Sequence, residues 1–164
     1  MSRTDLVMEQ HMEQVCAPIP NAEVFMLDEA RFEHYWPNIT DSLEAQPDLW
    51  NKWYTIESIR DRIMNNHMQA WVVCEKDGPI RAVFLTQILI CEVGNILQLF
   101  WLRGNLPEGA LKCISVALDR FGFHNGCCRL TLFGRKGWER RLAGLGAKFE
   151  GITLSRPIHQ PLRN

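Results

Sequence analysis

Three apolar segments joined by short turns constrain the fold of this chain more than any other feature. They span residues 69–75, 80–92 and 96–102, and each is rich in the β-branched, aliphatic and aromatic residues typical of buried strands. Asp77-Gly78 is a hairpin signal between the first two segments, and Gly94-Asn95 turns the chain between the second and third. The sequence therefore predicts an antiparallel meander in the middle of the chain.

A strand and two helices are expected before this meander. Residues 23–27 have the composition of a strand, and Asp28 can cap the helix that follows, which we expect to break at Pro37 and restart as a short helix near Thr40. Residues 55–64 form the clearest helix, because Thr55 suits the N-cap and isoleucines recur on one face.

After the meander the pattern predicts helix, strand, helix and strand. Pro107 suits the first turn of a helix that runs to about Phe123. Residues 128–133 read as a buried strand, a glycine turn and a short basic helix follow, and Gly146 is a natural C-terminal stop. Residues 149–158 supply the last strand or pair of strands.

The length of 164 residues fits one domain over 23–158, with an N-terminal arm over 1–22 and a C-terminal tail over 159–164. The formal net charge of −1 predicts no general attraction to nucleic acid or anionic lipid. No run of residues reaches the length of a membrane span, and no signal peptide is expected because the first residues are polar and acidic.

The six cysteines indicate neither a metal site nor a disulfide framework. Cys74, Cys91 and Cys113 sit in apolar runs, where a free cysteine behaves as a small hydrophobic residue. Cys127 and Cys128 are adjacent and lack a paired motif elsewhere. We therefore expect no metal, and a reducing compartment of synthesis.

Two groups of residues are candidates for binding a protein partner. One is aromatic and the other is the basic helix with its tryptophan; each is also explained by core packing or by a solvated helix face. Their members are Trp50, Trp53, Arg135, Lys136, Trp138, Arg140 and Arg141.

The order of elements over residues 23–156 resembles that of the GNAT superfamily of acyl-CoA-dependent N-acyltransferases. The segment Gly134-Arg-Lys-Gly-Trp-Glu-Arg-Arg-Leu-Ala-Gly-Leu-Gly146 is similar to a Gly-Arg-x-Gly-Trp-x-Arg-x-Leu pattern in GNAT-like proteins encoded in phage and prophage genomes. The resemblance implies an α+β (mixed α/β) fold, with a mostly antiparallel, twisted central sheet of six to seven strands flanked by about four helices.

The resemblance also implies where acetyl-CoA would bind. In the superfamily the fourth strand splays from the fifth, and the pyrophosphate rests on N–H groups at the start of the next helix. The implied cofactor-binding residues here are Leu102, Arg103, Gly104, Gly109 and Ala110. The family pattern Gln/Arg-x-x-Gly-x-Gly/Ala is not matched in either register: from Arg103, Leu106 and Glu108 occupy its small positions, and from Leu106, Gly109 is recovered but Leu111 takes the second small position. Glu108 either repels phosphate or complements the helix dipole.

The residues for proton transfer also depart from the resemblance. Many members place a tyrosine in the last helix, where it protonates the leaving thiolate; that position is Leu142 here, and Arg135 replaces the asparagine that often begins this helix. Glu92 ends the third strand, Gln98 cannot act as a base, and His124 fits a helix end. The catalytic residues are therefore unassigned, and enzymatic activity is left open.

These departures favour a catalytically silent, phage-encoded protein that needs no cofactor. It would be made in a bacterial host cytoplasm and act in the virion or its assembly, through contacts with other virion or assembly proteins or with itself. The alternative is an active acetyl-CoA-dependent N-acetyltransferase of unknown acceptor. A DNA-contacting module built on the basic cluster over 129–148 is the weakest hypothesis, because the net charge is nearly neutral and no recognition motif is present.

Overall fold

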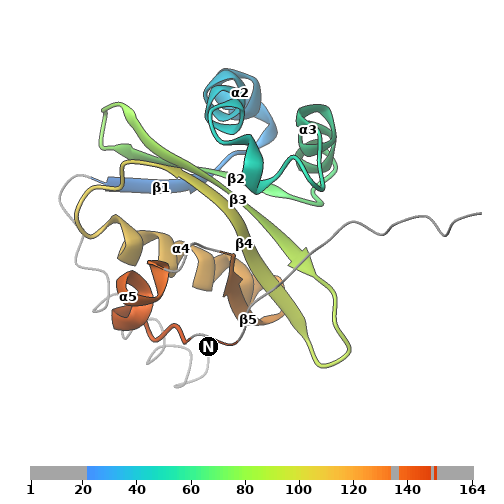
Figure 1. Cartoon of the computed structure of the whole chain (residues 1–164), viewed down its shortest axis with the longest axis vertical. Coiled ribbons are helices and arrows are strands. Elements are labelled where there is room, and N and C mark those ends of the chain that lie inside the picture. The colour runs from blue at the N-terminus through green and yellow to red at the C-terminus, as the bar shows by residue number, and fades with distance from the viewer. Residues whose placement is uncertain (1–21, 134–136, 149, 151–164) are drawn as a thin grey trace, which may run out of the picture.

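The structure is a computed structural model that describes residues 22–133, 137–148 and 150 of the 164-residue chain (Figure 1). The expected arm over 1–22 (apart from Ala22), the last strand over 149–158 (apart from Glu150) and the tail over 159–164 lie outside the described residues. The elements, in chain order, are β1 (Ala22–Met26), α2 (Glu29–Glu44), η1 (Pro47–Leu49), α3 (Ile56–Met64), β2 (Gln69–Glu75), β3 (Ile80–Leu89), β4 (Asn95–Gly104), α4 (Ala110–His124), β5 (Cys127–Leu132), α5 (Trp138–Leu142) and η2 (Ala143–Leu145).

The sheet has the strand order β1-β2-β3-β4-β5. The first three pairings are antiparallel, which confirms the meander, and β4 pairs with β5 in parallel. A parallel pair needs a crossover, and α4 supplies it. The mixed α/β class and the largely antiparallel sheet are therefore confirmed, and the described residues form five strands where six to seven were expected.

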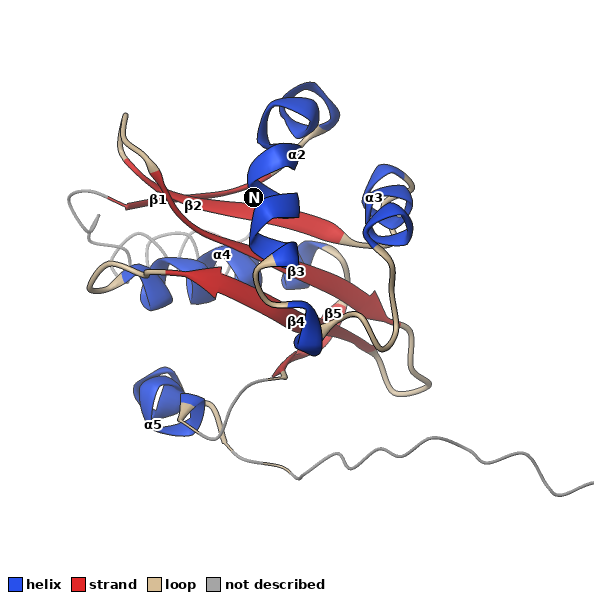
Figure 2. Cartoon of the chain, turned by 45° about the horizontal axis from the view of Figure 1, so that its top comes forward, coloured by secondary structure: helices blue, strands red, loops and turns tan. Residues whose placement is uncertain are grey.

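Helices cover both faces of the sheet. Figures 1 and 2 show α2 and α3 over one face and α4 under the other. Each face has its own apolar layer, because the side chains of a strand alternate between the two faces. Buried residues on the α2–α3 face include Phe32, Ile39, Leu43, Ile59, Val83, Leu85 and Trp101. Those on the α4 face include Trp71, Phe84, Leu97, Leu99, Ile114 and Leu118.

Helix α2 continues through Pro37, so the break expected there is wrong and no second helix begins at Thr40. A proline inside a helix removes one backbone hydrogen bond and costs about 3 kcal/mol. Phe32, Ile39 and Leu43 offset this cost, because they form one stripe along the helix and are each 1% exposed or less.

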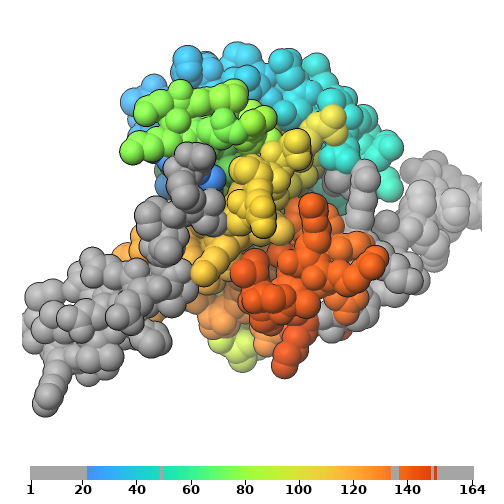
Figure 3. Space-filling view, turned by 90° about the vertical axis from the view of Figure 1, so that its left-hand side faces the viewer, coloured from blue at the N-terminus to red at the C-terminus, as the bar shows by residue number. Residues whose placement is uncertain are grey.

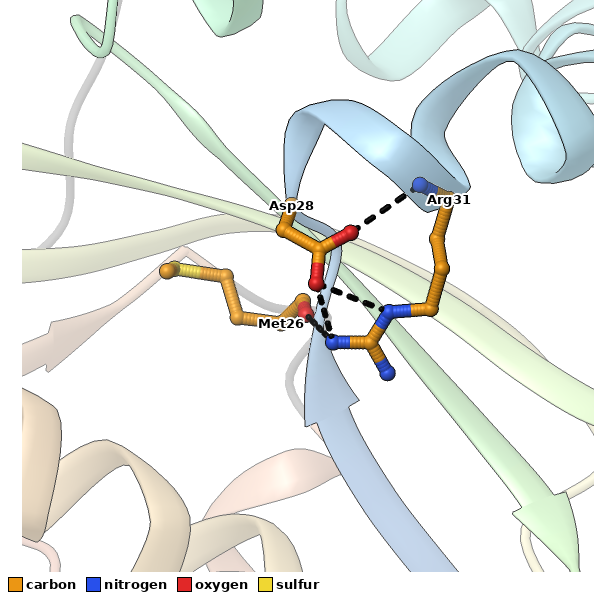
Figure 4. Close-up of polar contacts among 3 residues, drawn as sticks. All are labelled: Met26, Asp28 and Arg31. Atoms are coloured by element: carbon orange, nitrogen blue, oxygen red, sulfur yellow. Dashed lines mark hydrogen bonds and ion pairs between the residues drawn. The ribbon is translucent and has the colours of Figure 1, made fainter.

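The corner between β1 and α2 is held by Asp28, as the sequence predicts (Figure 4). The Asp28 carboxylate accepts a hydrogen bond from the Arg31 backbone N–H at 2.9 Å and from the Arg31 guanidinium at 2.8 Å and 3.1 Å. The same guanidinium donates to the Met26 carbonyl oxygen at 3.4 Å. One arginine therefore joins the end of the strand to the first turn of the helix.

The Asp28→Asn variant is expected to lower the Tm above about pH 5 and to matter progressively less toward pH 2. Side-chain and then backbone hydrogen bonds from Arg31 lower the pKa of Asp28 in the folded state. The charged carboxylate therefore stabilises the fold above its ordinary pKa of about 3.9, and this stabilisation is lost as the pH falls through the lowered folded value. Thermal unfolding of both proteins between pH 2 and pH 7 measures the effect; a pH-independent difference in Tm would contradict it.

Two other local predictions are confirmed. Thr55 caps α3 in a capping box, in which its hydroxyl accepts from the Ser58 N–H at 3.1 Å and the Ser58 hydroxyl accepts from the Thr55 N–H at 3.0 Å. The β2–β3 turn forms at Asp77-Gly78, where Asp77 has a φ of +55° and the Gly78 N–H donates to Glu75 at 2.9 Å.

Strands β3 and β5 differ from their expected form. β3 ends at Leu89 instead of Glu92, and Ile90 and Val93 lie exposed in the turn to β4. β5 was expected to be buried, but Leu130 and Phe133 are 40% and 55% exposed. The reason is position: β5 is the edge strand of the described sheet, and the apolar alternation of a strand does not reveal whether a neighbour covers it.

Candidate functional site

Strand β4 is longer than its parallel neighbour β5, which ends half-way along it. The pairing runs from Asn95 opposite Cys127 to Leu99 opposite Leu132, and the Phe133 N–H closes it on the Leu99 carbonyl at 3.1 Å. The rest of β4, residues 100–104, pairs with no part of β5, and its residues 101–104 pair with β3. We call this place, where β4 extends beyond the end of β5, the fork; here one edge of β4 presents backbone N–H and C=O groups without a β5 partner.

A β-bulge lies at the point where the fork opens. Leu85 of β3 faces Trp101, and Thr86 faces Leu99, so Phe100 is the extra residue on β4. Phe100 and Trp101 consequently both pack on the α2–α3 face, although they are adjacent in the strand. The bulge re-aims the second half of β4 where its pairing with β5 ends.

The N-terminus of α4 lies five residues after the end of β4 and has no side-chain cap. Its N-cap is Gly109, in the left-handed region at φ +78°, whereas Asp28 and Thr55 cap α2 and α3 with side-chain oxygens. The Ala110 N–H donates to the Pro107 carbonyl at 3.1 Å, so Pro107 lies before the helix and not in its first turn as expected. The start of α4 therefore carries the partial positive charge of a helix N-terminus without a side chain to neutralise it.

The charged side chains at this end are mostly basic. α2 and α3 carry Glu29 and Glu57 in their first turns, as the helix dipole favours, but α4 has no acid in its first turn and carries Lys112 there. Arg103 is the last residue but one of β4, and its side chain is half-buried. Glu108 is exposed in the loop and opposes these charges. The excess of positive charge near the start of α4 favours the binding of an anion.

The five residues implied as a cofactor site are brought to one end of the sheet. Leu102 packs on the α4 face, Ala110 is fully buried at the start of α4, and Gly109 is its N-cap. Gly104 ends β4 at φ +140° against the backbone of Arg81 and Ala82. Figure 3 looks onto this side, where the yellow atoms of the end of β4 and the following loop lie between the green β2–β3 turn and the orange-red α5 region.

The titratable residues considered as bases are not at the fork. Glu92 lies in the turn between β3 and β4, at the opposite end of β4. His124 is the last residue of α4 and its Nδ1 lies 2.8 Å from the Arg120 carbonyl oxygen, which fits a helix-end role. Leu142 is half-buried in α5, and Arg135 lies outside the described residues. The expected proton-transfer positions that lie in the described residues therefore supply no acid or base to the fork.

A row of neutral polar side chains crosses the α2–α3 face just before the fork, and the sequence did not reveal it. The Tyr54 hydroxyl donates to Gln87 Oε1 at 3.3 Å, and Gln87 Nε2 donates to Gln98 Oε1 at 2.7 Å. Gln98 faces Thr131 of β5 in the pair that precedes the last one. The strand register brings these four residues together from three strands and the loop before α3. Their spacing in the sequence does not predict this row.

Two buried polar atoms on β4 and β5 have no hydrogen-bond partner among the residues that the structure describes. They are Thr131 Oγ1, at the end of the row, and Trp101 Nε1, on β4 beyond the bulge. Trp101 is 1% exposed. Buried polar groups normally form hydrogen bonds, and a buried group without one costs about 1–3 kcal/mol. Groups of this kind are expected where a ligand or water completes the bonding.

Burial affects two of the cysteines in the described chain. Burial raises the pKa of Cys127 and of Cys74, which keeps both thiols protonated at neutral pH. Within the described residues no cluster of three histidine, cysteine or acidic side chains could hold a metal ion.

The partner-binding candidates have different environments. Trp50 is buried, and its Nε1 donates to the Leu43 carbonyl at 3.0 Å, so it belongs to the core; Trp53 is 65% exposed. Arg140 and Arg141 are exposed on α5, and the Arg141 guanidinium lies 5.9 Å from the centre of the half-buried Trp138 ring. Arg135 and Lys136 lie outside the described residues.

Two cavities lie away from the fork. One of about 230 Å³ separates the C-terminal half of α4 from β5, and its lining includes Leu118, Asp119 and Cys127. The other, of about 250 Å³, lies among the ends of β1, α3 and α4, where Met26, Asn66 and Asn125 line it. Burial raises the pKa of Asp119 in the first.

Solved structures with the same fold are acetyltransferases. An aminoglycoside acetyltransferase from an uncultured soil metagenomic sample aligns with a TM-score of 0.66 at 12% identity, over 84% of this chain and 99% of its own. The aminoglycoside acetyltransferase AAC(6')-Iy, in complex with a CoA bisubstrate analogue, aligns at 0.62 and 15% over the same shares. This chain has the GNAT fold.

Further comparisons agree with the GNAT fold. A ribosomal-protein-alanine N-acetyltransferase from Brucella melitensis biovar Abortus 2308 aligns with a TM-score of 0.58 at 14% identity, over 84% of this chain and 99% of its own. The sequence matches no family model and no curated protein. At these identities the likeness concerns the fold, with the fork between β4 and β5 as its distinctive feature here.

No helix in the described part of this GNAT-fold chain combines the length and the apolar character needed to cross a membrane.

Proposed function

We propose that this protein is an acetyl-CoA-dependent acyltransferase that acetylates an amine. One observation supports the proposal most directly: the open edge of β4 ends beside the uncapped N-terminus of α4. Structures with the same fold include AAC(6')-Iy in complex with CoA. The proposal therefore follows the acetyltransferase alternative and not the silent-scaffold hypothesis.

The residues present fit a CoA thioester at the fork. The free backbone groups of residues 100–104 can hydrogen-bond the amides of a pantetheine chain, as a further strand would. The α4 N-terminus, Arg103 and Lys112 suit its phosphates. When bound, the thioester supplies an acyl carbon that an amine can attack, with the thiol as leaving group. Glu108 is the single poor fit, and its exposure allows it to turn to solvent.

The role of the protein in this reaction is to bind and orient. Amine and thioester held side by side react faster because the entropy of bringing them together is already lost. The side chains of the polar row are uncharged, so no carboxylate or imidazole of the row takes the proton of the amine. The acceptor amine accordingly reacts in its unprotonated form.

The expected role in a phage virion remains a prediction. Exposed Trp53, Arg140 and Arg141 are compatible with protein contacts, but no observation favours a virion partner, self-association or a phage origin over ordinary surface exposure. The acetyltransferase proposal has the fold and the fork in its support.

Calorimetry with coenzyme A tests the proposal. Lys112→Glu is expected to weaken binding about tenfold, because it places a second acid beside the phosphates at the start of α4. Arg120→Glu is the matched control: it reverses the same charge on the same helix about 12 Å away, and should change the Kd less than twofold. Absence of binding heat at millimolar coenzyme A would refute the proposal.

A further inference from the structure

Packing alone does not account for the polar composition of the row, which consists of Tyr54, Gln87, Gln98 and Thr131. The same strands place large apolar side chains on this face at Val83 and Leu85, and both are buried. Gln98 is also 8% exposed, and burying an amide is costly unless its hydrogen bonds are made. An apolar pair at Gln87 and Gln98 would hold the two strands together without that cost.

The position of the row relates it to the fork. Tyr54 packs its ring against Phe100, the residue of the bulge, with the ring centres 5.8 Å apart. Gln98 and Thr131 form the pair of the β4–β5 ladder that precedes the last one. The row therefore ends one residue before the strands separate, on the face opposite α4.

The row is incomplete at its β5 end. Tyr54, Gln87 and Gln98 are joined by two hydrogen bonds, whereas Thr131 Oγ1 is buried and has no partner within the described part of the chain. A hydroxyl can donate one hydrogen bond and accept two. A ligand group placed at the fork next to Thr131 and Gln98 can supply what is missing.

The charge placed against the row is positive. The Arg62 guanidinium lies 5.2 Å from the centre of the Tyr54 ring, in a cation–π contact. All four members of the row are uncharged. An ammonium group beside the row would find no carboxylate among its four members, and a carboxylate would displace neutral hydrogen bonds at a desolvation cost.

We infer that this row is the part of the proposed site that recognises the acceptor, and that it selects a neutral hydrogen-bonding group, such as a hydroxyl or carboxamide, next to the reacting amine. The inference rests on the proposed function and adds the class of acceptor. Gln98 and Thr131 contact the neutral group, and Gln87 and Tyr54 orient Gln98; the row has no carboxylate to attract a cationic acceptor.

Three small amines test the selection, because they share a primary amine and differ at the far end. They are 3-aminopropan-1-ol, 1,3-diaminopropane and β-alanine, used with acetyl-CoA and thiol release as the readout. The alcohol is expected to have a kcat/KM about tenfold above the other two, since a site built for hydrogen bonding rejects groups that leave it unpaired.

Two variants separate recognition from structure. Thr131→Val nearly keeps the shape of the side chain and is expected to lower kcat/KM for the alcohol about fivefold, with the KM for acetyl-CoA unchanged and the Tm not lowered, because the hydroxyl that it removes is buried without a partner. Gln98→Glu places a carboxylate in the row and is expected to reverse the preference toward the diamine, which no purely structural role of Gln98 would produce.

Different outcomes test this inference and the proposed function. The inference is overturned if the diamine is the best acceptor of the unmodified protein, if Thr131→Val changes none of the three rates, or if protein that binds coenzyme A acetylates none of the three amines. Those results leave binding at the fork intact. Failure to bind coenzyme A in the calorimetric experiment would instead remove the proposed function, and this inference with it.

Discussion

Replacing Gly104 with alanine is expected to destabilise the protein by about 3 kcal/mol or more. Gly104 ends β4 at φ +140°, a backbone conformation that side chains other than glycine rarely adopt. An added Cβ would overlap the Arg81 carbonyl oxygen and the Cα of Ala82. Both obstacles are backbone of the neighbouring strand, so relief requires β3 and β4 to move apart.

The consequence reaches the proposed site because Gly104 lies at the open end of the fork. The Arg81 carbonyl that the new methyl would strike also accepts from the Asn105 N–H at 2.9 Å, which starts the loop toward α4. Urea unfolding measures the loss in stability. Gly144→Ala is the matched control, since a Cβ there meets nothing within 4 Å; it should lie within about 0.5 kcal/mol of the unmodified protein. Equal stability of Gly104→Ala and Gly144→Ala would contradict the prediction, because it would mean that residue 104 has neither the positive φ nor the close backbone contacts described here.

Removing the side chain of Trp101 is the second large effect. Trp101→Ala is expected to cost about 4 kcal/mol, because the indole is 1% exposed and fills the layer between the sheet and the α2–α3 pair. Its position depends on the bulge at Phe100, so the cavity would open beside the fork. Chemical denaturation with unchanged far-ultraviolet circular dichroism in the native state measures it.

Trp101→Phe gives the matched comparison. Phenylalanine keeps most of the apolar volume and removes Nε1, the buried donor without a partner. Removing an unsatisfied donor recovers part of its desolvation cost, so this variant should stay within about 1.5 kcal/mol of the unmodified protein. If Trp101→Phe is as unstable as Trp101→Ala, the indole N–H contributes a hydrogen bond that the native fold requires.

Predictions that depend on local chemistry are confirmed. Asp28 and Thr55 cap their helices because each oxygen bonds an N–H three residues along the chain. Asp77-Gly78 makes its turn and Gly146 adopts the left-handed conformation for the same reason: the interacting atoms are neighbours in sequence. The meander and the mixed α/β class follow from these local elements, and the position of the α4 loop follows from the resemblance.

Predictions that require knowledge of distant neighbours fail or are missing. The exposure of Leu130 and Phe133 depends on what lies beside β5. The burial of Trp50 depends on the Leu43 carbonyl, which its indole N–H reaches across the turn after α2. The sequence does not predict the polar row, because its members are up to 77 residues apart. A glutamine in a strand also adds nothing to the apolar periodicity from which strands are predicted.

The amino-acid sequence by itself determined the order of helices and strands, their caps and their tight turns, because short-range sterics and hydrogen bonds decide them. Tertiary structure alone decided that α2 runs through Pro37, that β4 bulges at Phe100, and that Gln98 meets Gln87 and Thr131 at the fork. Burial of an apolar stripe outweighs one lost backbone hydrogen bond, and strand register is set by the packing of both faces at once.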